Sequence, residues 1–391
     1  MKVVYTAPNR AHHYRYASSL NKANFLLAFV SGFPRLSPRA KLIELKQKLY
    51  RADILQTIYL LSLKMRASKK MSDNLAYLAK IEQDFACKKF LKEADVFVFY
   101  NGNGLSSCNY ANKIGKITVV EVVNSHVEYQ EDLLREEHES LNLPWEPFHT
   151  KDKERRIKEY DEADYILLPS EFVKQSFLAK GFQEEKLLKV PYGFTIPVQK
   201  GSSHIKDDTT FNVLYVGSVS VRKGIRYLIE AFKMLEIPNK KLIIVGPIAQ
   251  ISGIEDIDFT DDIEFIGVLK GADLEKEYQL ADVFCLPTIE DGYGLVLGEA
   301  LSYGLPLITT TNSGGLDLIS EGIEGFIVPI RDSLAIYEKL KLLSSNSELL
   351  IKMKLAALEK TASMNGWEAS GNILCEQLEA VYLKHTKSWK K

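Results

Sequence analysis

Short apolar runs recur along the whole chain and are separated by stretches in which apolar residues have helical spacing. Runs that are apolar on both faces are typical of strands buried between two layers, and amphipathic stretches between them are typical of crossover helices. The pattern predicts strands at Val3–Thr6, Val96–Tyr100, Ile117–Val123, Tyr165–Leu168, Val213–Gly217, Leu242–Gly246, Ile263–Gly267, Val283–Leu286, Leu307–Thr310 and Gly325–Val328. It predicts helices at Ile225–Leu235, Leu334–Leu343 and Trp367–Tyr382. This alternation indicates an α/β protein with parallel sheets.

About ten to twelve strands are more than one ordinary doubly wound sheet contains. The strand pattern is interrupted at 196–210 by Pro, Gly, Ser and paired Asp residues, which mark a boundary. We therefore expect an N-terminal domain at 1–197, a C-terminal domain at 210–365, and a final helical segment at 366–391 that packs back toward the N-terminal domain. Two such domains facing each other leave a cleft at the carboxyl ends of their strands, where ligands bind.

Composition excludes two classes of protein. The 391 residues are 46% hydrophobic and 26% charged, which excludes general disorder, and 50 Lys and Arg against 51 Asp and Glu give no basic excess for nucleic acid. The charge is unevenly placed, because residues 1–80 contain 15 basic and 3 acidic residues, a net charge of 15 − 3 = +12, and the remainder carries −1 − 12 = −13. Such a region can attract anionic surfaces or phosphorylated ligands, or it can simply be a solvated face.

Four cysteines without metal-binding spacing, and no signal peptide or membrane-spanning run, favour a cytoplasmic protein. The segment Ile54–Met71 is apolar and carries Lys64, Arg66, Lys69 and Lys70. It could rest on anionic lipid at the inner face of a membrane, or it could be a core-packing helix with a basic edge. The sequence leaves both interpretations open.

Two glycine-containing turns follow predicted strands in the second half. In the first, Gly217 and Ser218 lead to Arg222, Lys223 and a helix, an arrangement that suits an anion such as a diphosphate. In the second, Asp291, Gly292, Tyr293 and Gly294 lead to a helix that contains Glu299. The glycines can expose backbone amides to phosphate oxygens, and the two carboxylates can accept hydrogen bonds from sugar and ribose hydroxyls. The structural alternative is an exposed basic helix start and a capping Asp with a solvated Glu.

At this point the chain resembles the retaining GT-B glycosyltransferases of family 4, also called glycosyl transferases group 1. The resemblance lies in the order and spacing of five elements between residues 212 and 332. These elements are Gly217 with Lys223-Gly224, Pro287-Thr288 with Asp291-Gly292-Tyr293-Gly294 and Glu299-Ala300, Ser302–Thr309, Gly314-Gly315, and Gly325–Pro329 with Asp332. The resemblance implies two Rossmann-like domains facing across a cleft, with a nucleotide-sugar donor held by the second.

The resemblance also implies roles for individual residues. Lys223 and Arg222 would bind the donor diphosphate with the amides of Gly294, Leu295 and Val296, Glu299 would hold the ribose, and Val268 and Leu269 would lie against the base. Asp291 and His126 would face the transferred sugar as catalytic residues. The family usually has Glu where this chain has Asp291, and often has Arg where it has Ser218, so Arg222 would supply that charge.

The N-terminal loop departs from the family, because Arg10, His13 and Arg15 stand where a Gly-Gly loop is common. These residues could bind an anionic acceptor, such as a glycan or a lipid-pyrophosphate-linked sugar, or the donor phosphate, or could form a plain surface loop. Glu136-Glu137-His138-Glu139 lacks the second His of a zinc motif and is interpreted as a solvated helix face.

The predicted function is therefore retaining transfer of a sugar in cell-envelope polysaccharide synthesis, with no metal or other cofactor. The alternatives are a catalytically impaired nucleotide-sugar-binding scaffold subunit and a GT-B nucleotide-sugar epimerase.

Overall fold

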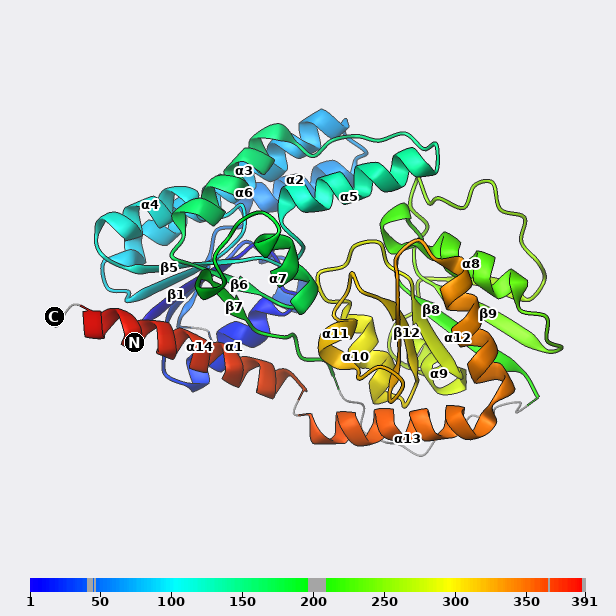
Figure 1. Ribbon diagram of the computed structural model, residues 1–391. Helices are drawn as coiled ribbons and strands as arrows, with labels where there is room; N and C mark the ends of the chain where they lie inside the picture. The colour runs from blue at the N-terminus through cyan, green and yellow to red at the C-terminus, as the bar shows by residue number, and fades with distance from the viewer. Residues whose placement is uncertain (41–44, 46, 196–208, 365, 389–391) are drawn as a thin grey trace.

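The computed structural model describes residues 1–40, 45, 47–195, 209–364 and 366–388. Its strands form two parallel sheets, one in each half of the molecule (Figure 1). The strand order is β3-β2-β1-β4-β5-β6-β7 in the first sheet and β10-β9-β8-β11-β12-β13 in the second. The predicted fold class, α/β with two doubly wound sheets, is confirmed. Most of the predicted break at 196–210, residues 196–208, lies outside the described residues.

The first sheet and its helices occupy residues 3–189. The strands are β1 (Val3–Ala7), β2 (Leu26–Ser31), β3 (Leu49–Arg51), β4 (Val96–Tyr100), β5 (Ile117–Glu121), β6 (Tyr165–Leu168) and β7 (Leu187–Lys189). The helices are α1 (His13–Lys22), α2 (Ile54–Lys64), α3 (Lys69–Leu91), α4 (Leu105–Lys113), α5 (Val127–Ser140), α6 (Thr150–Glu162) and α7 (Glu171–Leu178), with short 3₁₀ turns η1 (Pro38–Ala40) and η3 (Glu184–Lys186).

The second sheet and the helices that follow it occupy residues 211–388. The strands are β8 (Phe211–Val216), β9 (Lys240–Val245), β10 (Ile263–Gly267), β11 (Val283–Leu286), β12 (Leu307–Thr310) and β13 (Gly325–Val328). The helices are the 3₁₀ turn η4 (Val221–Lys223), α8 (Ile225–Met234), α9 (Ala272–Leu280), α10 (Leu295–Ser302), α11 (Gly315–Leu318), α12 (Ser333–Ser345), α13 (Ser347–Ser363) and α14 (Gly366–Ser388).

All ten predicted strands are present, with ends that differ by a few residues, and three further strands were missed. β3 and β7 are three residues long, which is too short to leave a pattern in the sequence. β2 is an apolar run that fits a buried helix as well as a strand, so periodicity alone does not identify it. The three predicted helices correspond to α8, α12 and α14.

The central strands are buried on both faces, as their composition predicted. Every residue of β1, β5 and β11 is buried. One apolar cluster extends from the first sheet through Tyr192 and Phe194 into the second sheet. The two halves therefore share part of their core, which holds their facing edges together.

The last helix, α14, returns from the second half and lies on α1 of the first (Figure 1). The Ser370 hydroxyl donates to the Pro191 carbonyl oxygen at 2.7 Å and lies 3.2 Å from the Tyr16 hydroxyl. At Gly371 an added Cβ would lie 2.0 Å from the Ser19 hydroxyl, so glycine permits the two helices to approach closely.

Candidate active site

Each sheet has one point where the strand order reverses, and ligands of open parallel sheets bind beside that point, at the carboxyl ends of the strands. The reversal lies between β1 and β4 in the first sheet and between β8 and β11 in the second. The loop before α1 and the loop 101–104 follow the first pair, and both glycine-containing turns identified in the sequence follow the second pair. The fold therefore places the predicted donor motifs at the expected edge.

A cleft of about 1200 Å³ lies between the two halves and α14. Its walls include Arg10, His12 and Arg15 from the first half, and Leu295 and Glu299 from α10 of the second. Trp367 and Glu368 of α14 also line it. The structure thus brings the predicted acceptor residues Arg10 and Arg15 together with two of the predicted donor residues.

The turn after β8 is fixed by backbone contacts. The Gly217 amide donates to the Val245 carbonyl oxygen at 2.9 Å, and the buried Tyr215 hydroxyl donates to the Ser218 carbonyl oxygen at 2.7 Å. Gly224, which follows η4, has φ 60°, and an added Cβ would lie 2.1 Å from the Pro287 carbonyl oxygen. A side chain at this position would separate η4 from the end of β11, which explains why glycine follows Lys223.

Arg222 and Lys223 are both paired with carboxylates, and neither cation is among the residues that line the cleft. Arg222 donates through Nε to Glu290 Oε2 at 2.7 Å and through its terminal nitrogen to Asn124 Oδ1 at 3.0 Å. Lys223 forms an ion pair with Asp291. Burial would raise the pKa of Asp291, but Lys223 and Arg222 outweigh burial and hold this pKa below its ordinary value. The two cations predicted to meet a diphosphate are therefore neutralised in this structure.

The loop after β11 also touches the first half. At Gly292 an added Cβ would lie 1.7 Å from the Val123 carbonyl oxygen, and the Ser170 hydroxyl donates to the Gly292 carbonyl oxygen at 2.5 Å. Tyr293 is buried, with its ring centroid 5.4 Å from that of Tyr192. This close contact with the first half leaves no room for a side chain at position 292, whether or not the loop binds a phosphate.

The start of α10 borders the cleft. Gly294 precedes the helix with φ 74°, and the amides of Leu295 and Val296 in the first turn have no acceptor within the helix. Glu299 lies one turn after Leu295 on the same face, and Tyr278 donates to its Oε2 at 3.3 Å. Burial raises the pKa of Glu299. This end of α10 offers two backbone donors and one carboxylate to a ligand.

Val268 and Leu269, predicted to lie against the donor base, directly follow β10. The Val268 side chain is exposed, and Leu269 is half-buried against the core. The structure therefore leaves an apolar side chain accessible at this strand end.

The structure does not bring His126 into the cleft. Its side chain is buried and its ring packs against those of Tyr160, Phe177 and Phe182, with centroid distances of 4.9, 5.1 and 5.7 Å. His126 caps α5 by accepting from the Glu128 amide at 3.3 Å. Burial, and then Lys180, lowers the pKa of His126 to about 4.

His13 is also buried, unlike the neighbouring Arg10 and Arg15. Its Nδ1 lies 2.6 Å from the Tyr5 hydroxyl and 3.3 Å from Glu121 Oε2. His12, His13 and Glu121 form the one group in the described part of the chain whose ligand atoms lie within 4.8 Å of one another and could hold a metal ion. These atoms already bond to each other, so an ion would have to replace those bonds.

The sequence analysis missed Glu290, an acidic residue between the two halves. Glu290 is fully buried and accepts from the Ser125 amide and hydroxyl at 3.1 and 2.8 Å and from Gln130 Nε2 at 2.8 Å, in addition to Arg222. The only sequence signal was a second acid directly before Asp291. Partners 160 or more residues away cannot be read from local pattern.

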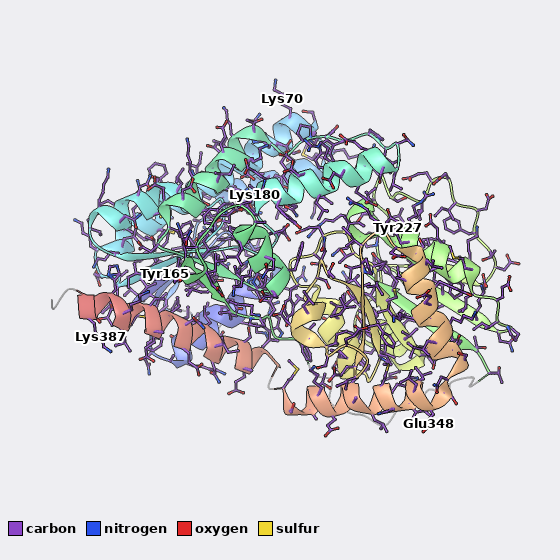
Figure 2. All side chains as sticks on the ribbon, viewed as in Figure 1. Lys70, Tyr165, Lys180, Tyr227, Glu348 and Lys387 are labelled. Carbon is purple, nitrogen blue, oxygen red and sulfur yellow. The ribbon has the colours of Figure 1, made fainter. Side chains whose placement is uncertain are left out.

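The interpretation of Glu136–Glu139 as a solvated helix face was wrong at Glu137. This residue is fully buried, and its carboxylate accepts from Arg331 Nε at 2.5 Å and from the Tyr227 hydroxyl at 2.8 Å. Tyr227 belongs to α8, at the side of the second half that faces α5 (Figure 2). Its two partners, Arg331 and Tyr227, come from the other half of the molecule.

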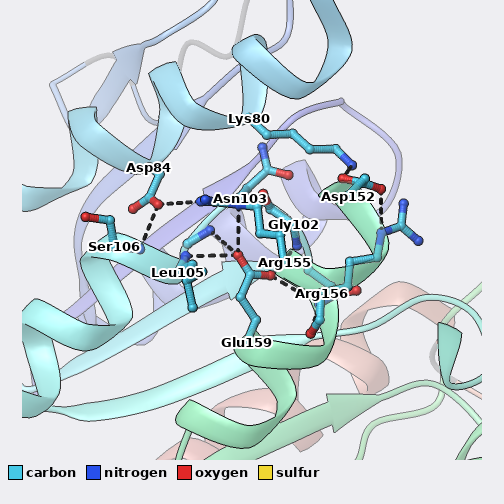
Figure 3. Close-up of polar contacts among 12 residues, drawn as sticks. Lys80, Asp84, Gly102, Asn103, Leu105, Ser106, Asp152, Arg155, Arg156 and Glu159 are labelled. Carbon is cyan, nitrogen blue, oxygen red and sulfur yellow. Dashed lines mark hydrogen bonds and ion pairs between the residues drawn. The ribbon is translucent and has the colours of Figure 1, made fainter. Parts of the chain in front are cut away.

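The loop after β4 is held by a second buried carboxylate (Figure 3). Glu159 of α6 accepts from the amides of Gly104 and Leu105, both at 2.9 Å, from the Gly102 amide, and from Asn101 Nδ2 at 3.1 Å. Next to it Asp84 accepts from the Ser106 and Ser107 amides and pairs with Arg155, while Asp152 is shared by Lys80 and Arg156. This network fixes the backbone at the carboxyl end of β4.

Comparison with known proteins finds a family that the second half resembles. Residues 199–360 match the family model of glycosyl transferases group 1. A capsular polysaccharide biosynthesis glycosyltransferase, CapM of Staphylococcus aureus, is 31% identical over 182 residues, which are 44% of this chain and 46% of CapM. The amylovoran biosynthesis glycosyltransferase AmsK of Erwinia amylovora is 27% identical over 258 residues, 60% of this chain and 63% of AmsK. These matches thus span less than two thirds of either relative.

Solved structures match nearly the whole chain in fold. HepE of Anabaena, solved in complex with UDP, superposes with a TM-score of 0.65 at 15% identity over 97% of this chain and 100% of that one. The sucrose-phosphate synthase of Thermosynechococcus elongatus gives a TM-score of 0.66 at 15% identity over 98% and 100%. The expected GT-B architecture is thereby confirmed. Residues 199–360 thus match the model of the glycosyl transferases group 1 family, and the chain has the GT-B fold.

Proposed function

We propose that this protein is a retaining glycosyltransferase that moves a sugar from a nucleotide-diphosphate donor to a hydroxyl of a glycan or lipid-linked acceptor in polysaccharide synthesis. The observation that carries the proposal is a single cleft with Glu299 and the first turn of α10 on one wall and Arg10 and Arg15 on the other. The similarity to CapM and AmsK, both named as polysaccharide biosynthesis enzymes, supports this choice of pathway class. HepE, which has the same fold, was solved with UDP and with UDP-glucose.

In the proposed reaction, an acceptor hydroxyl oxygen bonds to the anomeric carbon while the bond from that carbon to the diphosphate breaks. The hydroxyl proton passes to the departing diphosphate on the same face of the sugar. Lys223 would exchange its partner Asp291 for the diphosphate, and the amides of Leu295 and Val296 would donate to it. Asp291, released from Lys223, would then face the sugar. Because Lys223 and these amides would stabilise the negative charge of the departing diphosphate, we propose that transfer does not require a metal ion.

The function is tested by thermal unfolding with UDP-, GDP- and ADP-sugars, followed by transfer assays with lipid-linked and soluble glycan acceptors. A donor at about 100 times its Kd is expected to raise Tm by about 5 °C, because it binds only the folded state. Transfer is expected with retention at the anomeric carbon and to persist in EDTA. Inversion would contradict the stereochemistry proposed, and loss of activity in EDTA that returns with a divalent cation would contradict metal independence.

The same assays separate the alternatives. An epimerase would convert the donor sugar without any acceptor. A scaffold subunit would give the thermal shift with neither transfer nor conversion. Transfer that requires the acceptor excludes both.

We also propose that the α2–α3 hairpin rests on anionic lipid. The outward face of α2 is apolar, because Ile54, Ile58, Leu61 and Met65 are exposed at helical spacing while the polar Ser62 is buried. Residues 54–72 contain no acidic side chain, and Figure 2 shows Lys70 at the outer end of the hairpin, pointing away from the molecule. An apolar helix face flanked by cations suits the interface of an anionic bilayer. Within the described ranges no helix has both the length and the apolar character needed to cross a membrane.

Replacing Leu61 and Met65 by Asp is expected to lower binding to vesicles of 30% phosphatidylglycerol by about 100-fold, because it removes two apolar contacts and adds two negative charges. The measurement is sedimentation with vesicles at low and moderate salt. Leu355→Asp on α13, an equally exposed apolar site, is the matched control and should bind as wild type. Equal binding by all three proteins would refute the assigned surface.

A further inference from the structure

A buried polar network lies at the strand reversal of the first sheet. Glu121 ends β5 and is 1% exposed, and its carboxylate contacts His12 Nε2 at 2.6 Å and the Tyr5 hydroxyl at 2.7 Å. His13 Nδ1 lies 2.6 Å from the same Tyr5 hydroxyl. A carboxylate is costly to bury without partners, and here each oxygen has one. The network therefore fixes the position of His12.

This network is the counterpart of the donor motifs in the second half. Tyr5 lies in β1, and His12 directly precedes α1, the helix that follows β1. They lie beside the point where β1 and β4 diverge, as η4 lies beside the divergence of β8 and β11. Of the histidines in the described chain, His12 is the one that lines the cleft, together with Glu299 of the opposite half. His126, to which the family resemblance assigned the sugar contact, does not line it.

The His12 ring is held firmly. Its centroid lies 4.2 Å from that of Tyr192 and 5.1 Å from that of Tyr16. Although His12 occupies the N-cap position of α1, its side chain makes no capping hydrogen bond there. The ring is thus placed by Glu121 and by its contacts with the two tyrosine rings, and not by a capping bond to the helix that follows it.

The chemistry of His12 follows from these contacts. Burial first, and His13 next, lower the pKa of His12 to about 4, against the opposing effect of Glu121, so the ring is neutral near pH 7. A neutral imidazole carries one N–H and one acceptor nitrogen. Because Glu121 is a carboxylate, Nε2 carries the proton and donates to it, and Nδ1 is the acceptor.

We propose that His12, oriented by Glu121, contacts the substrate in the cleft and accepts a hydrogen bond from a sugar hydroxyl. The hydroxyl belongs either to the transferred sugar or to the acceptor sugar. This inference rests on the proposed function and assigns the contact of the first half to a residue of the N-terminal loop and not to His126.

The test compares His12→Phe, which keeps a ring but removes both nitrogens, with the matched control His126→Phe. His12→Asn and Glu121→Gln are milder variants in case the first does not fold. For each protein, the rise in Tm is measured with the free nucleotide (UDP, GDP or ADP) and with the matching sugar nucleotide. The kcat and KM of transfer are measured as well. Loss of one hydrogen bond to the reacting sugar is expected to lower kcat/KM by about 10- to 100-fold in both His12 variants. The His126 variant should lose less kcat/KM than either His12 variant, because the His126 ring does not line the cleft.

The two sources of the hydroxyl give different results. If it belongs to the transferred sugar, His12→Phe keeps the shift caused by the free nucleotide and loses the additional shift caused by the sugar nucleotide. If it belongs to the acceptor, both shifts stay and KM for the acceptor rises. Wild-type kinetics in the folded His12 variants, or a larger loss in His126→Phe, would overturn the inference. Absence of any nucleotide shift in the wild-type protein would instead refute the proposed function.

Discussion

Replacing Glu299 by Ala is expected to lower transfer by about 100- to 1000-fold while the protein remains folded, because one positioned polar contact to a reacting or bound substrate contributes this much. Glu299 lines the cleft, and its hydrogen bond from Tyr278 is long at 3.3 Å, so the carboxylate is available to a ribose hydroxyl. The measurement is kcat/KM for the donor, with circular dichroism to verify folding. Glu368→Ala removes an acid from the α14 wall of the same cleft and should change kcat/KM by less than about 3-fold.

Lys223→Ala is expected to lower transfer by about 100- to 1000-fold as well, but for a different reason. The variant removes the cation proposed for the diphosphate and also leaves the half-buried carboxylate of Asp291 without its ion-pair partner. The double variant Lys223→Ala with Asp291→Asn removes the orphaned charge. If the double variant recovers wild-type transfer, Lys223 serves only to neutralise Asp291 and does not bind the donor.

Replacing Glu159 by Ala is expected to lower the free energy of unfolding by about 3–5 kcal/mol. Its carboxylate is fully buried and accepts from three backbone amides and from the Asn101 side chain (Figure 3). The variant leaves the three amides without this acceptor, while Asn101 Nδ2 keeps the Arg156 carbonyl oxygen at 3.4 Å. Urea unfolding measures the effect. Glu159→Gln retains one acceptor oxygen and should lose less.

Glu162→Ala provides the control for helix propensity and charge, because Glu162 is exposed on the same helix, α6. Its change should stay within about 0.5 kcal/mol. If the free energy of unfolding of Glu159→Ala differs from that of wild type by less than about 1 kcal/mol, the loop after β4 does not depend on this carboxylate.

Two buried carboxylates, Glu290 and Glu137, connect donor binding to the contact between the two halves. Glu290 joins Arg222 of the second half to Ser125 and Gln130 of the first, and Glu137 joins Arg331 and Tyr227 to α5. These bonds cross between the halves next to the residues proposed to bind the diphosphate. Donor binding would therefore change charge pairs that also hold the two halves together, and this links ligand binding to the arrangement of the domains.

The candidate site was partly predictable. The turns at Gly217–Gly224 and Asp291–Glu299 were identified because glycine, cations and carboxylates directly follow buried strands, a signal that lies within a few consecutive residues. His126 was chosen by resemblance, since a lone histidine after a strand carries no local information about where its ring points. His12 was passed over because its significance depends on Glu121, 109 residues further along the chain.

The sequence by itself determined the alternation of strands and helices, the two doubly wound sheets and the strand ends where glycine-containing turns with charged residues follow. It could do so because burial on both faces of a strand imposes a local pattern of apolar residues. Only the tertiary structure decided which polar groups face each buried carboxylate: Ser125 for Glu290, Arg331 for Glu137, and His12 for Glu121. A buried charge is stabilised by partners at its own depth, and these come from whichever segments the fold brings there, however distant in sequence.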